Sequence, residues 1–386
     1  MLCKLNHQCC ISIESGDTMK RVLFITNIPS PYRVSFFGEL GKSMDLTVLY
    51  ADNQADHTTR SADWFIEGQG NYRSVFLKKR VLKIGEDSLC LDVVNWLKQD
   101  FDHVILGMYS SPTTMLAMLW MKLHGKPFWL EVDGGLIRQD SKLKYLVKKM
   151  LVSAPAGWIS SGKYTTKYLV HYGAKEERVV EYPFTSLWRA DILEAAPTME
   201  EKQQLRKALG MEEEKIVLYV GRFLPEKGMD DLLESVPLLE SNIGVYFVGG
   251  EPTREHLDFC KAHNLTNVHF EGFKKKEALL EFYKAADLLA LPTKSDVWGL
   301  VINEAMACGL SVVTTNQCVA GLELIEDGVN GYVVPVNDRD AMVEKIHAVF
   351  HADHAQMGAN ALETIRYYTI ENMAKRHVEF LSEQEK

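Results

Sequence analysis

Two acidic residues, Asp296 and Glu304, stand eight positions apart behind a strand-like run of the chain. That run, Leu288–Pro292, is apolar, and the good helix formers of Leu300–Cys308 ahead of a glycine predict a helix. A strand, loop and helix in this order direct free backbone N–H groups and the positive end of a helix dipole at one point, which attracts phosphate. A carboxylate beside a phosphate site is suited to accept hydrogen bonds from sugar hydroxyls. The segment therefore indicates a nucleotide-sugar site.

Two basic residues, Arg222 and Lys227, flank a turn that follows the apolar, strand-like run Lys215–Val220. Open α/β sheets bind their ligands at the carboxyl ends of strands. Two cations at such a place would neutralise a diphosphate leaving group, because they stabilise the charge that develops as the group departs. The alternative is an ordinary solvated pair in a surface loop.

From about Lys20 to its C-terminus the chain resembles the retaining glycosyltransferases of family 4, which have the GT-B fold. The loop Pro29–Arg33 is similar in style to that of bacterial polysaccharide-assembly members. The first acid of the family's pattern is usually Glu and is Asp296 here, so the sugar that it contacts, or the manner of contact, stays open. The resemblance rests on pieces that follow one another in the family's order: Leu218–Gly228, Val245–Gly250, Val268–Phe273, the acid-x7-Glu pattern of Asp296 and Glu304, Ser311–Thr315 and Gly328–Val334.

The resemblance implies a role for each residue of the donor site. Arg222 and Lys227 bind the diphosphate, Glu304 holds the ribose hydroxyls, and Asp296 meets hydroxyls of the transferred sugar. Plainer interpretations remain for three of them. Glu304 could be a helix N-terminal acid that only favours the helix dipole, and Asp296 an ordinary turn or N-cap residue. Phe273 could be a core aromatic residue and not one that lines the base. The other residues expected to line the base, or to let the backbone approach the ligand closely, are Gly221, Gly250, Phe273, Val297, Trp298, Gly299, Leu300 and Val301.

Candidates in the first half of the chain follow predicted strands into the same cleft. Ser30 and Arg33, in the loop after the first strand, are expected to approach the diphosphate or the acceptor, and a proline-stiffened turn is the alternative. Glu131 or Asp133 would orient the acceptor hydroxyl or act as a general base, with an Asp-Gly turn as the structural alternative. Tyr109 stands at a comparable strand end.

In the mechanism that the resemblance implies, the leaving diphosphate takes the acceptor proton on the face of departure, so no strong enzymic nucleophile is needed. We expect no cofactor and no metal, with Arg222 and Lys227 in the metal's place. The expected partners are a nucleotide diphosphate sugar as donor and a glycan or lipid-linked acceptor. Rival functions are a GT-B epimerase or phosphorylase and a catalytically silent nucleotide-sugar-binding protein. A dinucleotide oxidoreductase is disfavoured because no G-x-G-x-x-G follows the first strand.

Length and composition limit the classes of protein. With 386 residues the chain exceeds the roughly 250–300 residues of a single core, so two domains are expected. Its 46% hydrophobic and 25% charged residues are ordinary for a globular protein. A net charge of −9 argues against nucleic acid as a partner, because no surplus of cations remains for its phosphates.

Seven cysteines without zinc-type spacing indicate a reducing compartment, and no run of about 18 apolar residues suggests a membrane span. We therefore expect a cytoplasmic protein, at the inner face of the cytoplasmic membrane where it meets lipid. The basic amphipathic segment 142–151 is the candidate for a peripheral membrane contact, and a charge-flanked core helix is the alternative.

The elements that must position these residues alternate between strand and helix, which predicts an α/β fold with two Rossmann-like, doubly wound domains across a cleft. We predict an extension at 1–18, an acceptor-side domain at 19–190, a nucleotide-sugar domain at 191–365, and a helix at 366–386 that returns to the first domain. The predicted strands are Arg21–Thr26, Leu46–Tyr50, Ser74–Leu77, His103–Gly107, Pro127–Val132, Gly157–Ser160, Arg178–Glu181, Lys215–Val220, Gly244–Val248, Val268–Glu271, Leu288–Leu291, Ser311–Thr314 and Gly331–Val334. Helices are predicted between them, among others at Asp87–Lys98 and Leu322–Glu326.

Overall fold

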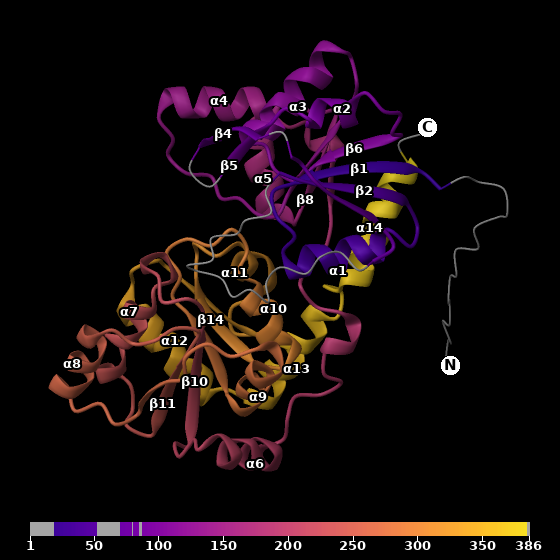
Figure 1. Cartoon of the computed structure of the whole chain (residues 1–386). Coiled ribbons are helices and arrows are strands. Elements are labelled where there is room, and N and C mark those ends of the chain that lie inside the picture. The colour runs from indigo at the N-terminus through magenta and orange to yellow at the C-terminus, as the bar shows by residue number, and fades with distance from the viewer. Residues whose placement is uncertain (1–18, 52–69, 79, 85–86, 384–386) are drawn as a thin grey trace, which may run out of the picture.

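The computed structural model describes residues 19–51, 70–78, 80–84 and 87–383, and the extension predicted at 1–18 lies outside them. Two α/β units stand one above the other in Figure 1, each built on its own parallel sheet. This architecture confirms the predicted fold class of two doubly wound domains. Among the described residues, no helix combines the length and the apolar character needed to cross a membrane.

A seven-stranded parallel sheet, in the order β3-β2-β1-β6-β7-β8-β9, forms the first domain. The order reverses between β1 and β6, so the loops after these two strands open at a topological switch point. The strands are β1 Arg21–Thr26, β2 Asp45–Tyr50, β3 Arg73–Phe76, β6 His103–Leu106, β7 Trp129–Val132, β8 Gly157–Ser160 and β9 Val179–Glu181. The helices are α1 Pro31–Leu40, α2 Val93–Leu97, α3 Pro112–Leu123, α4 Lys142–Val152 and α5 Lys163–His171.

The prediction of one helix over Asp87–Lys98 is wrong. The first part is strand β5, Asp87–Cys90, which pairs antiparallel with β4, Arg80–Ile84, and only α2 is helical. The hydroxyl of Thr113, at the start of α3, donates to the carbonyl of Ser88 and accepts from the backbone N–H of Cys90 at 2.9 Å. These contacts with a distant helix favour the extended backbone, and nothing in the local pattern announces them.

A six-stranded parallel sheet, in the order β12-β11-β10-β13-β14-β15, forms the second domain. Its order reverses between β10 and β13, which are adjacent in the sheet. The strands are β10 Lys215–Val220, β11 Ile243–Val248, β12 Val268–Phe270, β13 Leu288–Leu291, β14 Ser311–Thr315 and β15 Gly331–Val334. The helices are α6 Met199–Leu209, α7 Met229–Leu233, α8 Arg254–Ala262, α9 Lys276–Ala285, α10 Leu300–Ala307, α11 Val319–Leu324, α12 Arg339–His351 and α13 His354–Ile365.

Three helices of the second domain differ from prediction. The helix predicted near Gly228–Leu239 is shorter, since α7 spans only Met229–Leu233. The helix predicted at Leu322–Glu326 is α11, which begins three residues earlier, at Val319. No helix was predicted where α13 lies, in a segment that carries polar residues and a glycine. At this glycine, Gly358, α13 packs closely against the turn that follows α10, since a Cβ there would lie 2.5 Å from the carbonyl oxygen of Gly309.

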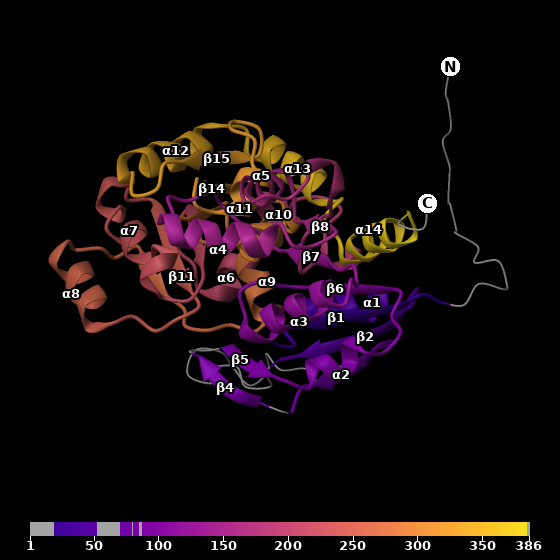
Figure 2. The same ribbon diagram turned by 90° about the horizontal axis from the view of Figure 1, so that it is seen from above.

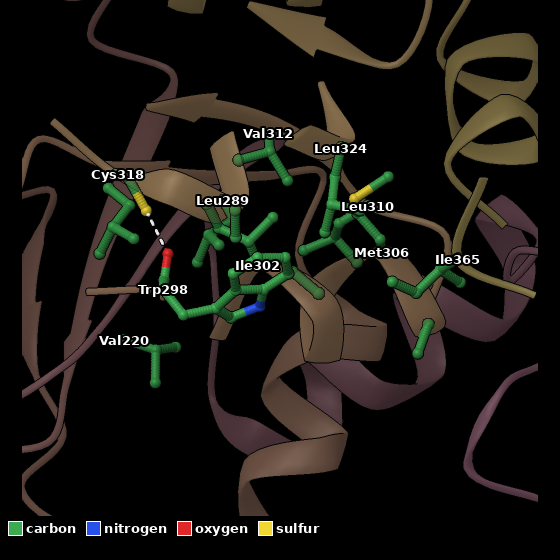
Figure 3. Packing of buried hydrophobic residues seen from close by; sticks show 14 of the residues in the cluster. Val220, Leu289, Trp298, Ile302, Met306, Leu310, Val312, Cys318, Leu324 and Ile365 are labelled. Carbon is green, nitrogen blue, oxygen red and sulfur yellow. Dashed lines mark hydrogen bonds between the residues drawn. The ribbon is translucent and has the colours of Figure 1, made fainter. Parts of the chain in front are cut away.

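The hydrophobic core is continuous between the two domains. Successive residues of β1 alternate between two clusters, because side chains of a strand point to opposite faces of the sheet. One cluster fills the outer face of the first sheet. The other runs from the first sheet through the buried ring of Phe184 to Trp298 and the strands of the second sheet. Figure 3 shows the second-domain part of it around Trp298 and Ile302.

The last helix, α14 at Ile370–Glu383, leaves the second domain and packs against the first (Figures 1 and 2). It lies beside α1, and the ring of Phe380 meets that of Trp129 on β7 edge-to-face at 4.9 Å between centroids. The C-terminal helix is thus part of the first domain's core.

Replacing Phe380 by Ala tests this packing. Because the side chain is 2% exposed, we expect the substitution to lower the free energy of unfolding by about 3–5 kcal/mol. Urea denaturation followed by tryptophan fluorescence would measure the change. The control is Tyr367→Ala at an exposed position, expected to stay within about 0.5 kcal/mol. Equal effects of the two substitutions would contradict the packing.

Candidate functional site

The loop after β10 is fastened to the loop after β13. The carbonyl of Glu226 accepts from the backbone N–H of Lys294 at 2.8 Å and from the hydroxyl of Thr293 at 2.9 Å. On the strand itself, the hydroxyl of Tyr219 donates to the carbonyls of Arg222 and Lys227 at 3.3 and 3.4 Å. The two basic residues therefore stand on a loop that is held from both sides.

Gly228 is the point of closest approach between these loops. Its φ is +70°, in the left-handed region, and a Cβ there would lie 2.0 Å from the carbonyl oxygen of Pro292 at the end of β13. Only glycine meets both conditions. The close approach brings the preceding residue, Lys227, to the loop that carries Asp296.

Lys227 and Asp296 form an ion pair, with Nζ 2.5 Å from Oδ2 and both side chains about one-fifth exposed. The Asp296 loop is fixed by its own backbone, since the N–H of Asp296 donates to the carbonyl of Gln317 at 3.0 Å. Arg222 is exposed on the adjacent turn. One ion pair thus joins the loops at the carboxyl ends of β10 and β13, and Arg222 lies on the same loop as Lys227.

Helix α10 begins directly after this loop. Gly299 precedes it with a φ of +103°, and a Cβ there would lie 2.5 Å from the sulfur of Cys318. That thiol in turn donates to the carbonyl of Trp298 at 3.0 Å (Figure 3). Leu300 and Val301 occupy the first turn, whose backbone N–H groups have no carbonyl of their own helix to bond.

Within this segment Trp298 and Val297 have opposite environments. The indole of Trp298 is 3% exposed and its Nε1–H donates to Oδ1 of Asn303 at 2.8 Å, so the side chain belongs to the core. Val297 is 63% exposed. If Trp298 contacts a ligand, it does so with its backbone.

Glu304 lies on α10 between two hydroxyl donors. Its Oε2 accepts from Tyr283 of α9 at 3.0 Å, and its Oε1 accepts from Ser186 at 3.3 Å. Burial raises the pKa of Glu304, while the hydrogen bonds from Tyr283 and Ser186 work in the opposite direction. The carboxylate is therefore oriented by groups outside its own helix.

Glycines at the ends of β10 and β11 bring two turns into contact. A Cβ at Gly249, whose φ is +122°, would lie 2.4 Å from the carbonyl oxygen of Gly221, and one at Gly250 would lie 2.7 Å from the ring of Phe223. Phe273, just after β12, is 60% exposed. Its exposure contradicts the core alternative and leaves the ring free at this edge of the sheet.

The first-domain candidates Arg33, Glu131 and Asp133 form one buried charge cluster. The guanidinium of Arg33 bonds the carboxylate of Glu131 through one nitrogen and that of Asp133, at 2.5 Å, through the other. Arg33 is 3% exposed, Glu131 is fully buried, and the nearby Ser30 is also buried. Arg33 and Glu131 engage one another inside the domain, and this placement does not support the substrate contact predicted for them.

Two more side chains complete the cluster. Tyr182 donates to Asp133 at 2.9 Å, and Nε2 of His377, on α14, lies 2.8 Å from the second oxygen of Glu131. Burial alone would raise the pKa of Glu131, but the charges of Arg33 and His377 outweigh it and lower the pKa to about 2. The pKa of Asp133 is raised by burial, against the effect of Arg33 and with a contribution from Glu131. Asp133, 19% exposed, is the member nearest to solvent.

The loop after β7, in the first domain, contacts the loop after β13, which carries Asp296 and is called the donor loop below. A Cβ on Gly134 would lie 1.7 Å from the carbonyl oxygen of Val297, and Arg138 donates to the hydroxyl of Ser295 at 2.6 Å. The structure therefore brings the Asp133 segment and the Asp296 segment together from opposite domains. Tyr109 lies farther along the first sheet, where its hydroxyl bonds that of Tyr168.

Four residues around these groups were not predicted: Ser186, Tyr283, Tyr182 and His377. Each acts through a contact distant in sequence, so no motif marks it. In the described part of the chain, no three His, Cys, Asp or Glu side chains are grouped so that they could hold a metal ion.

The family comparison matches the domain that carries this site. Residues 201–364 match the family described as glycosyl transferases group 1. The matched segment lies within the second domain. It includes Arg222, Lys227, Asp296 and Glu304, and thus all the catalytic candidates of the second domain.

Curated relatives match the chain over part of their length. An uncharacterized glycosyltransferase of Methanocaldococcus jannaschii is 32% identical over 213 residues, 53% of each chain. A D-inositol 3-phosphate glycosyltransferase of Mycolicibacterium gilvum is 34% identical over 170 residues, 41% of this chain and 37% of the relative. The chain thus spans about half, or less, of the length of the curated relatives it matches.

Solved structures share the fold over nearly the whole chain. Anabaena HepE, solved in complex with UDP and glucose, superposes with a TM-score of 0.72 at 17% identity and covers 95% of this chain and 100% of its own. A match of this kind shows the fold alone. The two domains together have the GT-B fold.

The buried charge cluster yields a stability prediction. Arg33→Met removes the cation that bonds both Glu131 and Asp133, so we expect the free energy of unfolding to fall by about 3–5 kcal/mol at pH 7. The matched control is Arg21→Met, whose pair with Asp45 is exposed and 3.7 Å long, with an expected loss below about 1 kcal/mol.

The loss should also depend on pH. Because the folded pKa of Glu131 is lowered to about 2, its stabilisation is present above the ordinary glutamate pKa of about 4.3 and disappears as pH falls through the folded value. In urea denaturation series the gap between wild type and Arg33→Met should therefore narrow as pH falls toward this folded value, because a protonated Glu131 no longer carries the charge that Arg33 neutralises. A gap independent of pH would contradict the charge assignment.

Proposed function

We propose that the chain is a retaining glycosyltransferase of family 4 that moves a sugar from a nucleotide diphosphate sugar to an acceptor hydroxyl. One observation carries the proposal: the loops after β10 and β13 bring Lys227 and Asp296 together just before the start of α10, which bears Glu304. The group 1 match over the same residues supports it, as does the UDP bound in the HepE structure of similar fold.

In the proposed reaction the donor diphosphate lies between Arg222, Lys227 and the N-terminus of α10. The two cations and the free N–H groups of the first turn stabilise the negative charge that grows as the glycosidic bond to the phosphate breaks. These groups take the place of a divalent cation, so the reaction needs no metal. Glu304 accepts hydrogen bonds from the ribose hydroxyls, and Asp296 accepts them from the transferred sugar.

The acceptor hydroxyl attacks the anomeric carbon from the face that the diphosphate leaves, and its proton passes to the departing phosphate oxygen. The anomeric configuration is thereby retained. Asp133 lies opposite the donor loop, but Arg33 and Tyr182 both occupy its carboxylate. Those contacts suit a residue that shapes the acceptor side better than one that takes the proton.

A panel of UDP-, GDP- and ADP-sugars without metal would test the function. Release of nucleoside diphosphate from one donor is expected, and Glu304→Ala should lower the rate at subsaturating donor about a hundredfold, because two charge-assisted hydrogen bonds are lost. The control is Glu344→Ala, an exposed acid on α12 of the same domain. Product analysis with and without acceptor separates transfer from the epimerase and phosphorylase alternatives. Donor binding without any turnover would favour a silent binding protein.

We also propose that the acceptor is a lipid-linked or polysaccharide glycan and that α4 rests on the cytoplasmic membrane. The apolar stripe of this helix is open to solvent: Leu143 is 74%, Leu146 60% and Met150 65% exposed, so the core-helix alternative is wrong. The helix carries four lysines, of which Lys148 and Lys144 pair with Asp140 at 2.8 and 3.2 Å. An exposed apolar stripe flanked by cations fits an anionic lipid surface.

Vesicle co-sedimentation tests the membrane contact. We expect binding to vesicles that contain anionic phospholipid and little binding to zwitterionic ones. Changing Lys142, Lys144 and Lys149 to Glu while keeping Lys148 in its ion pair should abolish it, because each lysine near the surface contributes about 1 kcal/mol. The control changes Lys207, Lys261 and Lys375, which lie on other helices, to Glu. Equal binding of both variants would contradict the contact.

A further inference from the structure

Ser186 lies on the connection between the two domains, between β9 and the first residues of the second domain. Its hydroxyl donates to Oε1 of Glu304 at 3.3 Å, while Tyr283 holds the other oxygen at 3.0 Å. One of the two groups that orient the ribose-binding carboxylate thus comes from outside the domain that binds the nucleotide.

The connection is anchored in both domains. The ring of Phe184 meets that of Tyr32 in the first domain edge-to-face at 5.4 Å and that of Trp298 in the donor loop at 5.3 Å. The carbonyl of Phe184 accepts from Asn303 of α10 at 3.2 Å. Asn303 and Glu304 are neighbours in the helix, so two successive residues of α10 bond the interdomain connection.

We propose that Ser186 is a positioning residue that couples the placement of the interdomain connection to donor binding through Glu304. The inference rests on the proposed function, which assigns Glu304 to the nucleotide ribose. A rotation of one domain against the other moves the connection, and the hydroxyl of Ser186 then moves with respect to the carboxylate. The donor therefore binds most tightly in the arrangement in which the connection holds Glu304 in place.

The pKa of Glu304 also depends on the charged groups that surround it. Lys276, which faces it from α9, favours the charged carboxylate, and Asp191, which precedes the second domain, disfavours it. These two form an ion pair at 3.0 Å, so their effects largely offset one another. Tyr283 and the buried thiol of Cys308 complete the surroundings. Among them the hydroxyls of Tyr283 and Ser186 donate directly to the carboxylate and stabilise its ionised form.

The test compares Ser186→Ala with Ser186→Thr, which keeps the hydroxyl. Binding of the nucleoside diphosphates UDP, GDP and ADP is measured by calorimetry over a pH series, next to wild type and Glu304→Ala. We expect Ser186→Ala to weaken binding about three- to tenfold at neutral pH and Ser186→Thr to restore it, because one hydrogen bond is lost and regained.

The pH series separates positioning from general stability. A protonated Glu304 no longer accepts hydrogen bonds on both carboxyl oxygens. The affinity for the nucleoside diphosphate is therefore present above the pKa of Glu304 and is lost as the pH falls through that pKa. Without the Ser186 hydroxyl the pKa rises further, and the midpoint of the acid loss should move to higher pH in Ser186→Ala only. Ser235→Ala is the control, since it removes a buried hydroxyl of the second domain that bonds the carbonyl of Asp231 at 2.6 Å instead of Glu304.

Three results would overturn the inference. If wild type binds no nucleoside diphosphate, the proposed function fails and this inference fails with it. If wild type binds and Glu304→Ala does not, but Ser186→Ala equals wild type in affinity and midpoint, the function stands and the coupling is wrong. If Ser186→Ala and Ser235→Ala weaken binding alike with an unchanged midpoint, Ser186 acts only on stability.

Discussion

The pairing of β10 with β13 is the constraint on which the candidate site depends. The two strands lie side by side although β11 and β12 separate them in the sequence, because the sheet grows first in one direction and then in the other. In open α/β sheets, the loops on either side of such a reversal lead to helices on opposite faces of the sheet, and ligands bind outside the strand ends at this point. Gly228 lets the loops touch, and the ion pair of Lys227 with Asp296 follows from that contact.

The first domain contains a buried network of charged side chains. Taking Arg33, Glu131 and Asp133 out of water is costly, and the cost is offset because each charged oxygen or nitrogen faces a partner from a different element. Arg33 comes from α1, the two acids from the end of β7, and His377 from α14. The network therefore connects the C-terminal helix α14 to the loop after β7 and fixes their positions relative to each other.

Between the two domains, the connection of Tyr182–Trp188 does more than join them. Tyr182 belongs to the charge network, Phe184 packs between Tyr32 and Trp298, and Ser186 bonds Glu304. Within a few residues the chain contacts both domains. In the proposed coupling, a change in the angle between the domains acts on Glu304 through these contacts.

The sequence by itself determined the elements with strong local patterns: strands such as Lys215–Val220 and Gly331–Val334 are uninterrupted apolar runs, and both occur as predicted. It also placed Arg222, Lys227, Asp296 and Glu304 on strand ends and a helix start, where the structure has them. The tertiary structure alone decided the β4–β5 hairpin, the burial of Arg33 with two acids, and the partners of Glu304. In each case the deciding contact joins residues far apart in the chain, such as Thr113 with Ser88 or Ser186 with Glu304, and local propensity contains no information about such pairs.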